Sequence, residues 1–120
     1  MGKTLKILIK RAYEKPVSAD GKRFLVDRLW PRGIKKENLK LEGWLKEAAP
    51  SSRLRQWFGH DPERWEEFRQ RYFDELKKHS DAWQPFLDTV KKSPVTLVYA
   101  AKDSQHNNAQ ALREFLEKNL

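Results

Sequence analysis

The chain has 120 residues and a net charge of +8, and this length is enough for one domain with its own hydrophobic core. It contains no cysteine, which excludes disulfides, thiolate metal sites and a cysteine nucleophile. No apolar run approaches the roughly 20 residues of a membrane span, and no signal sequence follows Met1. We therefore expect a cytoplasmic protein that has no membrane partner.

The positive charge is concentrated in the first half of the chain. Residues 1–60 carry 15 Lys and Arg against 6 Asp and Glu, a net charge of +9, whereas residues 61–120 carry 10 against 11. Such asymmetry favours an anionic partner, either a small molecule or a nucleic acid. A basic protein whose lysines are simply solvated is an equally good interpretation at this stage.

Two strands are predicted near the N-terminus. Leu5, Ile7 and Ile9 alternate with lysines, which is typical of a strand. After a loop over residues 12–22, the uninterrupted apolar run over residues 24–26 indicates a strand buried on both faces, as in a parallel sheet. The short connection leaves open whether the two strands form a hairpin or a parallel pair.

About four helices are predicted between the second and third strands. The first has apolar residues at helical spacing before Pro50: Leu41, Trp44, Leu45 and Ala48. The second begins after Ser51 or Ser52 and ends at Gly59, because serine is a common N-cap and glycine a common C-cap. The third and longest follows Asp61, and the fourth starts near Pro85.

The third strand is predicted over residues 95–100, and a polar loop over 101–106 leads to a last helix that begins around His106. The fold class is therefore α/β: a small, mostly parallel sheet of three or more strands with about five helices. We expect a single domain over residues 1–120. The excursion between strands two and three, roughly 65 residues, allows a right-handed parallel crossover.

The most informative segment is DRLWPRG, residues 27–33, which follows the second strand directly. Its guanidinium groups suit carboxylate or phosphate, its indole offers a stacking face, and its glycine allows close backbone approach. Its carboxyl group is a candidate base. The candidates are Asp27, Arg28, Trp30, Arg32 and Gly33. The alternative is structural, with the aspartate paired to its neighbouring arginine or capping a turn and the tryptophan in the core.

A second polar segment follows the third strand. Its lysine adds charge beside the N–H groups at a helix start, which favour an anion. Its two consecutive asparagines are poor helix formers, and a polar ligand is one reason for their presence. The candidates are Tyr99, Lys102, Asp103, His106, Asn107 and Asn108. Ordinary helix capping by Asp103 or Ser104 is the structural alternative.

Residues 54–62 are interpreted mainly as a helix junction, in which Gly59 ends one helix and Asp61 caps the next. This does not explain His60, which we retain as a candidate ligand-binding residue. The three histidines of the chain lack the close spacing of a metal site, and no glycine-rich phosphate or dinucleotide loop is present. We therefore expect neither a metal nor a cofactor.

These segments together resemble the YeaO-like family of small bacterial cytoplasmic proteins. The resemblance is carried by residues 26–33, 54–62, 95–103 and 106–109, and it covers nearly the whole chain. It implies an α/β domain of this length. It implies little about activity, because the family is classed as domain of unknown function 488. A wider set of relatives also ends the second strand with Asp-Arg, which implies that strands one and two are parallel and that both polar segments open at one sheet edge.

The sequence thus predicts a protein that binds an anionic small molecule, nucleotide-like or bearing phosphate or carboxylate, at the carboxyl edge of its sheet. Arginines and a lysine would hold the charge, and Trp30 or Tyr99 would stack. Asp27, Asp103 and His106 are the candidates for acid–base catalysis, but the residues leave open whether any reaction is catalysed. The alternatives are a nucleic-acid-binding module using the basic N-terminal half, and a structural or protein-interaction domain. The oligomeric state stays open.

Overall fold

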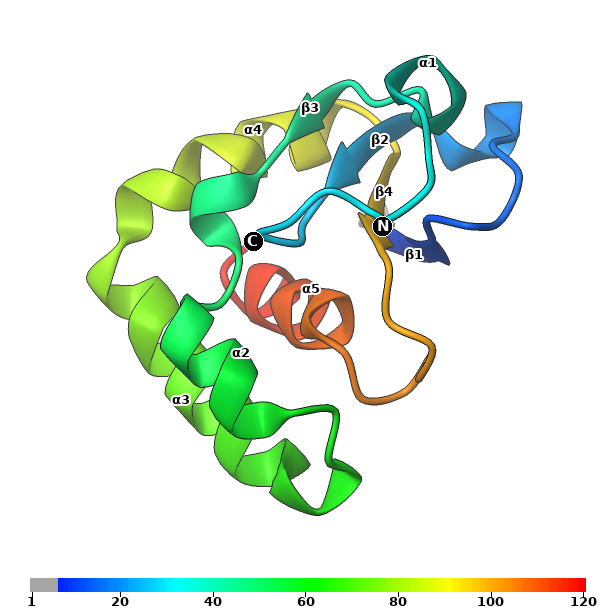
Figure 1. The fold of residues 1–120 in the computed structure, drawn as a ribbon. Coiled ribbons are helices and arrows are strands. Elements are labelled where there is room, and N and C mark those ends of the chain that lie inside the picture. Colours follow the sequence, from blue (N-terminus) through cyan, green and yellow to red (C-terminus); the bar gives the residue numbers. More distant parts are fainter. Residues whose placement is uncertain (1–6) are drawn as a thin grey trace.

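The computed structural model describes residues 7–120, in which a four-stranded sheet packs against helices (Figure 1). The strands are β1 (Ile7–Arg11), β2 (Lys22–Leu25), β3 (Gly43–Trp44) and β4 (Val95–Tyr99). The α-helices are α1 (Lys36–Leu39), α2 (Ser52–Phe58), α3 (Trp65–Lys78), α4 (Gln84–Lys92) and α5 (Asn108–Lys118). Short 3₁₀ turns cover Ser18–Asp20, Lys46–Ala48, Pro62–Arg64 and Ser80–Ala82.

All neighbouring strands of the sheet are parallel, and their order is β1-β4-β2-β3. The last strand in the sequence, β4, therefore lies between β1 and β2, and both Ile7 and Lys22 face Val95. This arrangement answers the open question about the first two strands: they are parallel, but they are not neighbours. The predicted α/β class with a small parallel sheet is confirmed, while Leu5 of the first predicted strand lies outside the described residues.

Both faces of the sheet are covered. On one face, β4 contributes Val95, Leu97 and Tyr99 to the main core, which α3, α4 and α5 complete. Figure 1 shows α5 beside the sheet and the α2–α3 pair outside α5. On the other face, Val98 packs with Leu39 of α1. Every residue of β4 is consequently buried, as the continuous apolar pattern of a central parallel strand requires.

The helix predicted over residues 41–48 is wrong. The segment instead contains β3 and a 3₁₀ turn, because its backbone pairs with β2: Leu45 N–H donates to Leu25 O at 2.8 Å. Gly43 allows this pairing, since a Cβ there would lie 3.2 Å from the Phe24 ring. A four-residue helix, α1, lies just before it in a segment where the sequence predicted none.

The caps of the middle helices agree with the sequence. Ser51 Oγ accepts a hydrogen bond from Leu54 N–H at 3.1 Å, and Gly59 ends α2 in the left-handed region with φ of 54°. Asp61 Oδ1 accepts from Glu63 N–H at 3.0 Å at the start of the turn that leads into α3. Within residues 7–120, no helix is long and apolar enough to cross a membrane.

A buried ion pair lies where the chain enters β2. Arg23 Nη1 donates to Asp20 Oδ2 at 2.7 Å and Lys10 Nζ contacts Asp20 Oδ1 at 3.1 Å, while Arg23 Nε donates to Leu39 O. Burial alone would raise the pKa of Asp20. The hydrogen bonds from Val17 N–H, Lys10 and Arg23 outweigh it and hold this pKa below its ordinary value.

Candidate functional site

An open pocket of about 820 Å³ lies where β2 and β4 end, at the carboxyl edge of the sheet. Both polar segments that follow these strands line it, as expected for parallel neighbours. The predicted site residues among its walls are Asp27, Arg28, Trp30, Arg32, His60, Lys102, Asp103, His106, Asn107 and Asn108. We call this cavity the carboxyl-edge pocket.

Two predicted site residues do not line the carboxyl-edge pocket. Tyr99 is only 4 % exposed and belongs to the main core, and burial raises the pKa of its hydroxyl. Gly33 sits in a turn with φ of 80°, a conformation that favours glycine, so the turn itself explains it. The suggested stacking role of Tyr99 therefore has no support in its position.

Asp27 ties the ends of the two strands together from inside the pocket. Its Oδ2 accepts a hydrogen bond from Ala100 N–H at 2.9 Å, and its main-chain oxygen accepts from Trp44 Nε1 at 2.7 Å. Among the ion pairs of residues 7–120, none joins Asp27 to Arg28. The pairing of these two neighbours, one part of the structural alternative for this segment, is therefore wrong.

Burial raises the pKa of the Asp27 carboxyl above its ordinary value of 3.8. The nearby Asn108 amide and Ala100 N–H act in the opposite direction, and so do Arg55 and His60, but together they do not outweigh burial. A carboxyl group with a raised pKa in a cleft is a common mark of a functional site.

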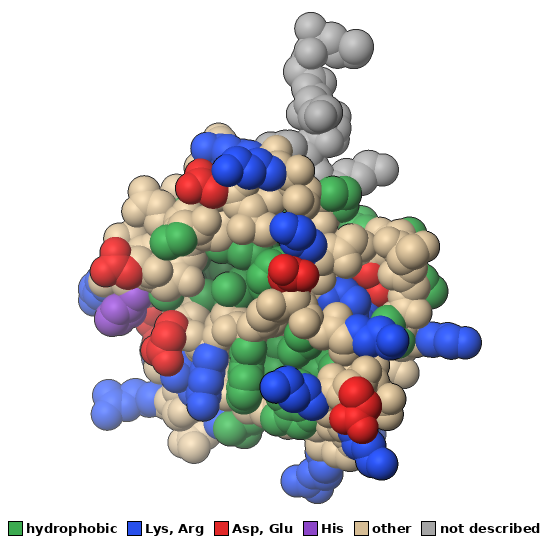
Figure 2. All heavy atoms as spheres, turned by 90° about the horizontal axis from the view of Figure 1, so that it is seen from above, with side chains coloured by type: hydrophobic (Ala, Val, Ile, Leu, Met, Phe, Trp, Pro, Cys, Tyr) green, Lys and Arg blue, Asp and Glu red, His purple; other side chains and the backbone are tan. Residues whose placement is uncertain are grey.

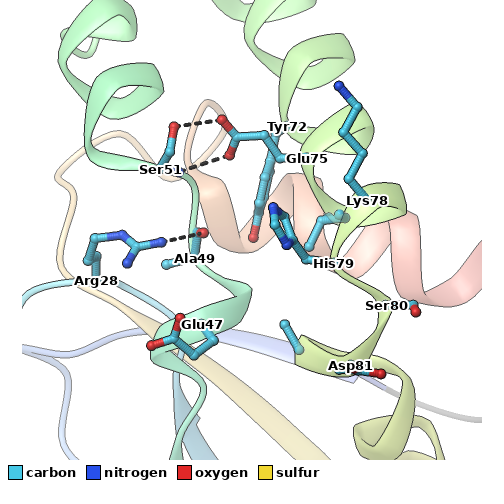
Figure 3. A pocket seen from close by; sticks show the side chains of 12 residues that line it. Arg28, Glu47, Ala49, Ser51, Tyr72, Glu75, Lys78, His79, Ser80 and Asp81 are labelled. Carbon is cyan, nitrogen blue, oxygen red and sulfur yellow. Dashed lines mark hydrogen bonds between the residues drawn. The ribbon is translucent and has the colours of Figure 1, made fainter.

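Arg28 donates to main-chain carbonyls rather than to a carboxylate. Its Nε donates to Pro50 O at 3.1 Å and its Nη2 to Ala49 O at 3.3 Å. Figure 3 shows the guanidinium reaching toward Ala49 at the wall of a second pocket, of about 520 Å³. Arg28 lines both pockets, so this one side chain belongs to the wall between them.

The second pocket has a mixed lining. Ser51 holds one part of its wall, since its N–H and Oγ donate to the two oxygens of Glu75 at 2.9 and 2.6 Å (Figure 3). Tyr72 holds another part, since its hydroxyl donates to Ala48 O. Its charged lining residues are Arg28 and Lys78 against Glu47, Glu75 and Asp81. This excess of carboxylates gives no preference for an anion.

The loop after β4 holds an oriented histidine at the carboxyl-edge pocket. His106 Nδ1 lies 2.9 Å from Asp103 Oδ2, and its ring packs edge-on against Trp65 at 5.4 Å between centroids. Hydrogen bonds from Gln105 N–H and from His106 lower the pKa of Asp103. The pair has the form of a base and its orienting carboxylate, but no Ser, Thr or Cys is among the described residues that line the pocket.

Structural roles account for the two consecutive asparagines. Asn107 is the N-cap of α5: it is 2 % exposed, its Oδ1 accepts from Gln110 N–H at 3.0 Å, and its Nδ2 donates to Asp103 O. Asn108 Nδ2 donates to Val26 O at 2.9 Å and so joins α5 to the end of β2. The predicted cap at Asp103 or Ser104 is wrong, and no ligand is needed to explain either asparagine.

Aromatic side chains form one wall of the carboxyl-edge pocket. Trp30 is half-buried, its Nε1 donates to Ile34 O at 2.7 Å, and its ring packs edge-on against Trp44 at 5.6 Å. Tyr13 is exposed, and its hydroxyl donates to Arg32 O at 2.8 Å. Part of the Trp30 ring thus faces the pocket although its polar atom is already bonded.

Sequence reasoning missed Arg11, Tyr13 and Arg55 as lining residues. Arg11 is the last residue of β1 and donates from Nε to Ala101 O at 2.9 Å, with its guanidinium over the Tyr13 ring at 4.7 Å. A parallel pairing of β1 with β4 would have indicated this position. Arg55 lies in α2, within the segment interpreted as a helix junction. His60, in the same segment, has φ of 58° and forms part of the wall as well as part of the junction.

Positive charge exceeds negative charge around the carboxyl-edge pocket. Its lining includes the cations Arg11, Arg28, Arg32, Arg55 and Lys102, against the carboxyl groups of Asp27 and Asp103. Arg32, Arg55 and Lys102 are exposed and form no ion pair within the described part of the chain. In that same part, no three His, Asp or Glu residues are grouped so that they could hold a metal ion.

Comparison with known proteins gives the family of the chain. Residues 6–120 match the family profile described as "Inactive DUF488-N3 subclade". The chain is 43% identical to the Escherichia coli (strain K12) protein named "Uncharacterized protein YeaO" over 112 residues, which are 93% of this chain and 97% of that protein. It is 38% identical to "Uncharacterized protein Rv3073c" of Mycobacterium tuberculosis over 116 residues, 97% of this chain and 98% of the relative. No solved structure matches. The chain therefore belongs to the YeaO-like DUF488 proteins, within the subclade described as inactive.

Proposed function

We propose that the carboxyl-edge pocket binds an anionic small molecule, nucleotide-like or bearing a phosphate or carboxylate group. The observation that carries this proposal is the excess of cations in its lining, five Lys and Arg against two Asp. Both carboxylates are already hydrogen-bonded, to Ala100 N–H and to His106. Arg32, Arg55 and Lys102 form no ion pair within residues 7–120, and a hydrogen bond between groups of opposite charge is strong and oriented.

The shape and lining of the pocket suit a small organic ligand better than a bare ion. Its volume of about 820 Å³ falls within the range of small-molecule sites. The apolar part of its lining includes Tyr13, Leu29 and Trp30, on which a ring or hydrocarbon can pack. A ligand that places its anionic group near Arg32, Arg55 or Lys102 can therefore also bury an apolar part.

Binding without turnover is the function we favour. The family description names an inactive subclade, and the pocket lining holds no hydroxyl or thiol nucleophile from Ser, Thr or Cys in its described part. The proposal accordingly assigns proton transfer to none of Asp27, Asp103 and His106. A cytoplasmic location is part of the proposal, since a chain without cysteine suits a reducing compartment.

The distribution of charge supports nucleic-acid binding less than it supports binding of an anionic small molecule. On the face drawn in Figure 2, Lys and Arg side chains are spread out and interspersed with carboxylates, and they do not form one stripe. Two tryptophans of the basic half, Trp30 and Trp44, pack on each other and donate their N–H groups to main-chain oxygens. Stacking platforms for single strands need open ring faces in a basic groove.

The test is ligand binding by the wild-type protein and two matched variants. Thermal shift and calorimetric titration with inorganic phosphate, citrate and adenosine monophosphate should show stabilisation by at least one of them. Arg55→Ala should weaken that binding about tenfold or more, because a charge-assisted hydrogen bond contributes roughly 1.5–3 kcal/mol.

Arg53→Ala is the control, since Arg53 is also exposed on α2 but does not line the carboxyl-edge pocket. It should bind the same ligands as the wild-type protein does. If no anion stabilises the wild-type protein, or if both variants lose affinity equally, the proposal fails.

A further inference from the structure

The carboxyl group of Asp27 is a feature that anion binding alone does not explain. It lies in the wall of a pocket with a cationic lining, where its negative charge opposes the binding of any anion nearby. Burial disfavours its ionised form, so the position costs folding stability as well. An uncharged side chain at this position would give a higher affinity for an anion and a more stable fold.

The structural task of Asp27 does not require a carboxylate either. Its Oδ2 accepts one hydrogen bond, from Ala100 N–H, and an asparagine amide oxygen can accept the same bond. Asn108, which joins α5 to the end of β2, shows that an amide suits this part of the fold. What an asparagine cannot reproduce is a group with two acceptor oxygens and no donor.

A carboxylate has about four lone-pair positions, of which Ala100 N–H uses one, and the nearby Asn108 amide also stabilises the charge. The remaining capacity is available to a ligand that brings a hydrogen-bond donor to this wall. Trp30 and Tyr13 line the same pocket with flat rings. A donor carried on a planar ring can therefore approach Asp27 while the ring packs on these aromatic groups.

We infer that the ligand carries two recognised groups: an anionic group held by the exposed cations, and a ring amino group that hydrogen-bonds to Asp27. The chemical class is an amino-substituted heteroaromatic ring with a phosphate or carboxylate, such as a mononucleotide with an amino-bearing base. This inference rests on the proposed function of the carboxyl-edge pocket and adds the specificity of the site to it. Asp27 is its specificity-determining residue.

The experiment compares ligands that carry the ring amino group with partners in which a carbonyl replaces it and the neighbouring ring nitrogen gains an N–H. Adenosine and inosine monophosphates share the phosphate and sugar but carry an amino group or a carbonyl at one ring position, and cytidine and uridine monophosphates form a second such pair. The wild-type protein should prefer the amino-bearing member of at least one pair by about tenfold or more, the usual effect of a hydrogen bond to a charged group. Asp27→Asn should bring that ratio close to one and leave affinity for inorganic phosphate equal or higher.

Asp103→Asn is the matched control, because Asp103 also lines the pocket but is paired with His106. It should keep the amino preference. Equal affinity of the wild-type protein for the members of both pairs, or a preference that survives in Asp27→Asn, overturns the inference while leaving anion binding intact. Failure of phosphate, citrate and all four nucleotides to bind overturns the proposed function itself.

A measurement on the unmodified protein keeps the inference testable if Asp27→Asn does not fold. In ¹⁵N amide spectra, the Ala100 and Asn108 signals should shift on adding the amino-bearing nucleotide and stay in place with inorganic phosphate alone, because both residues contact the end of β2 beside Asp27. Identical shifts with both ligands would contradict the inference.

Discussion

The pKa values of two carboxyl groups, Asp27 and Asp20, are shifted in opposite directions in this fold. The pKa of Asp27 is raised because burial outweighs its few favourable contacts, and that of Asp20 is lowered because Val17 N–H, Lys10 and Arg23 all stabilise its charge. The first carboxylate is therefore costly to the folded state at neutral pH, whereas the second stabilises it. A carboxylate that destabilises the fold and yet lies in the wall of a pocket indicates function more strongly than one that stabilises the fold.

This difference predicts the effect of Asp27→Asn on stability. A raised folded-state pKa means that the folded protein loses stability as pH rises from the ordinary value of 3.8 through the raised value. The variant should therefore have a higher Tm than the wild-type protein at pH 7, and the difference should vanish near about pH 3.5. Thermal unfolding at the two pH values measures this.

Asp20→Asn is the matched comparison. Since the folded-state pKa of Asp20 is lowered, its stabilising contribution is present above 3.8 and is lost as pH falls further, so this variant should lower Tm at pH 7. Removing one partner of a buried ion pair typically costs about 3–5 kcal/mol. A lower Tm for both variants at pH 7 would contradict the assignment of Asp27 as a costly group.

The predictability of the site also differs from residue to residue. Asp27 and Lys102 could be identified because charged side chains directly after apolar strands meet at one edge of a parallel sheet. Arg11 could not, because its position depends on β1 pairing with β4, a contact across most of the chain. Tyr99 does not line the pocket, and the sequence could not show this, since a strand buried on both faces has no alternation to indicate which side chain faces a ligand.

At the scale of elements, long periodic segments were predicted well, whereas the short elements α1 and β3 were not. The apolar face of α3, with Phe68, Tyr72 and Leu76, follows helical spacing over several turns and is confirmed. The same spacing over residues 41–48 was coincidental, because pairing with the carbonyls of Arg23 and Leu25 outweighed local preference. The register of a two-residue strand such as β3 depends on its partner, which no local pattern reveals.

The turn into β2 gives a prediction at this scale. Gly21 has φ of 65°, and a Cβ there would lie 2.4 Å from Pro94 O, the atom that accepts from Lys22 N–H at 3.0 Å. Gly21→Ala should therefore cost at least about 2 kcal/mol of unfolding free energy, because strain and a backbone clash add. Gly59→Ala should cost only about 1 kcal/mol, since its φ is similar but its nearest neighbour is 3.5 Å away.

Urea denaturation of both variants measures the difference in unfolding free energy, to which the clash at Gly21 and its ψ of −139°, against 30° at Gly59, both contribute. Equal losses of unfolding free energy would show that the contact between the β2 turn and the start of β4 does not constrain the fold. A larger loss in Gly59→Ala would contradict the geometry outright.

At the scale of the whole molecule, the net charge of +8 predicts a weak and salt-dependent affinity for nucleic acid. Single-stranded RNA should bind detectably at low ionic strength and release at about 0.15 M salt, and Arg53→Ala and Arg55→Ala should weaken it to similar extents. Fluorescence anisotropy titrations at several salt concentrations measure this. Tight binding that persists at about 0.15 M salt and depends on Arg55 alone would favour the nucleic-acid alternative.

The order of the strands has a consequence for how the protein is made. Because β4 separates β1 from β2, neither of these early strands has its main partner until residues 95–99 have left the ribosome. The first three quarters of the chain can form helices during synthesis, but they cannot assemble the sheet. Non-local pairing of this kind is slow, and it leaves apolar strand surfaces uncovered meanwhile. The nascent chain therefore depends on its final segment, and a chain that stops before Val95 lacks the centre of its own fold.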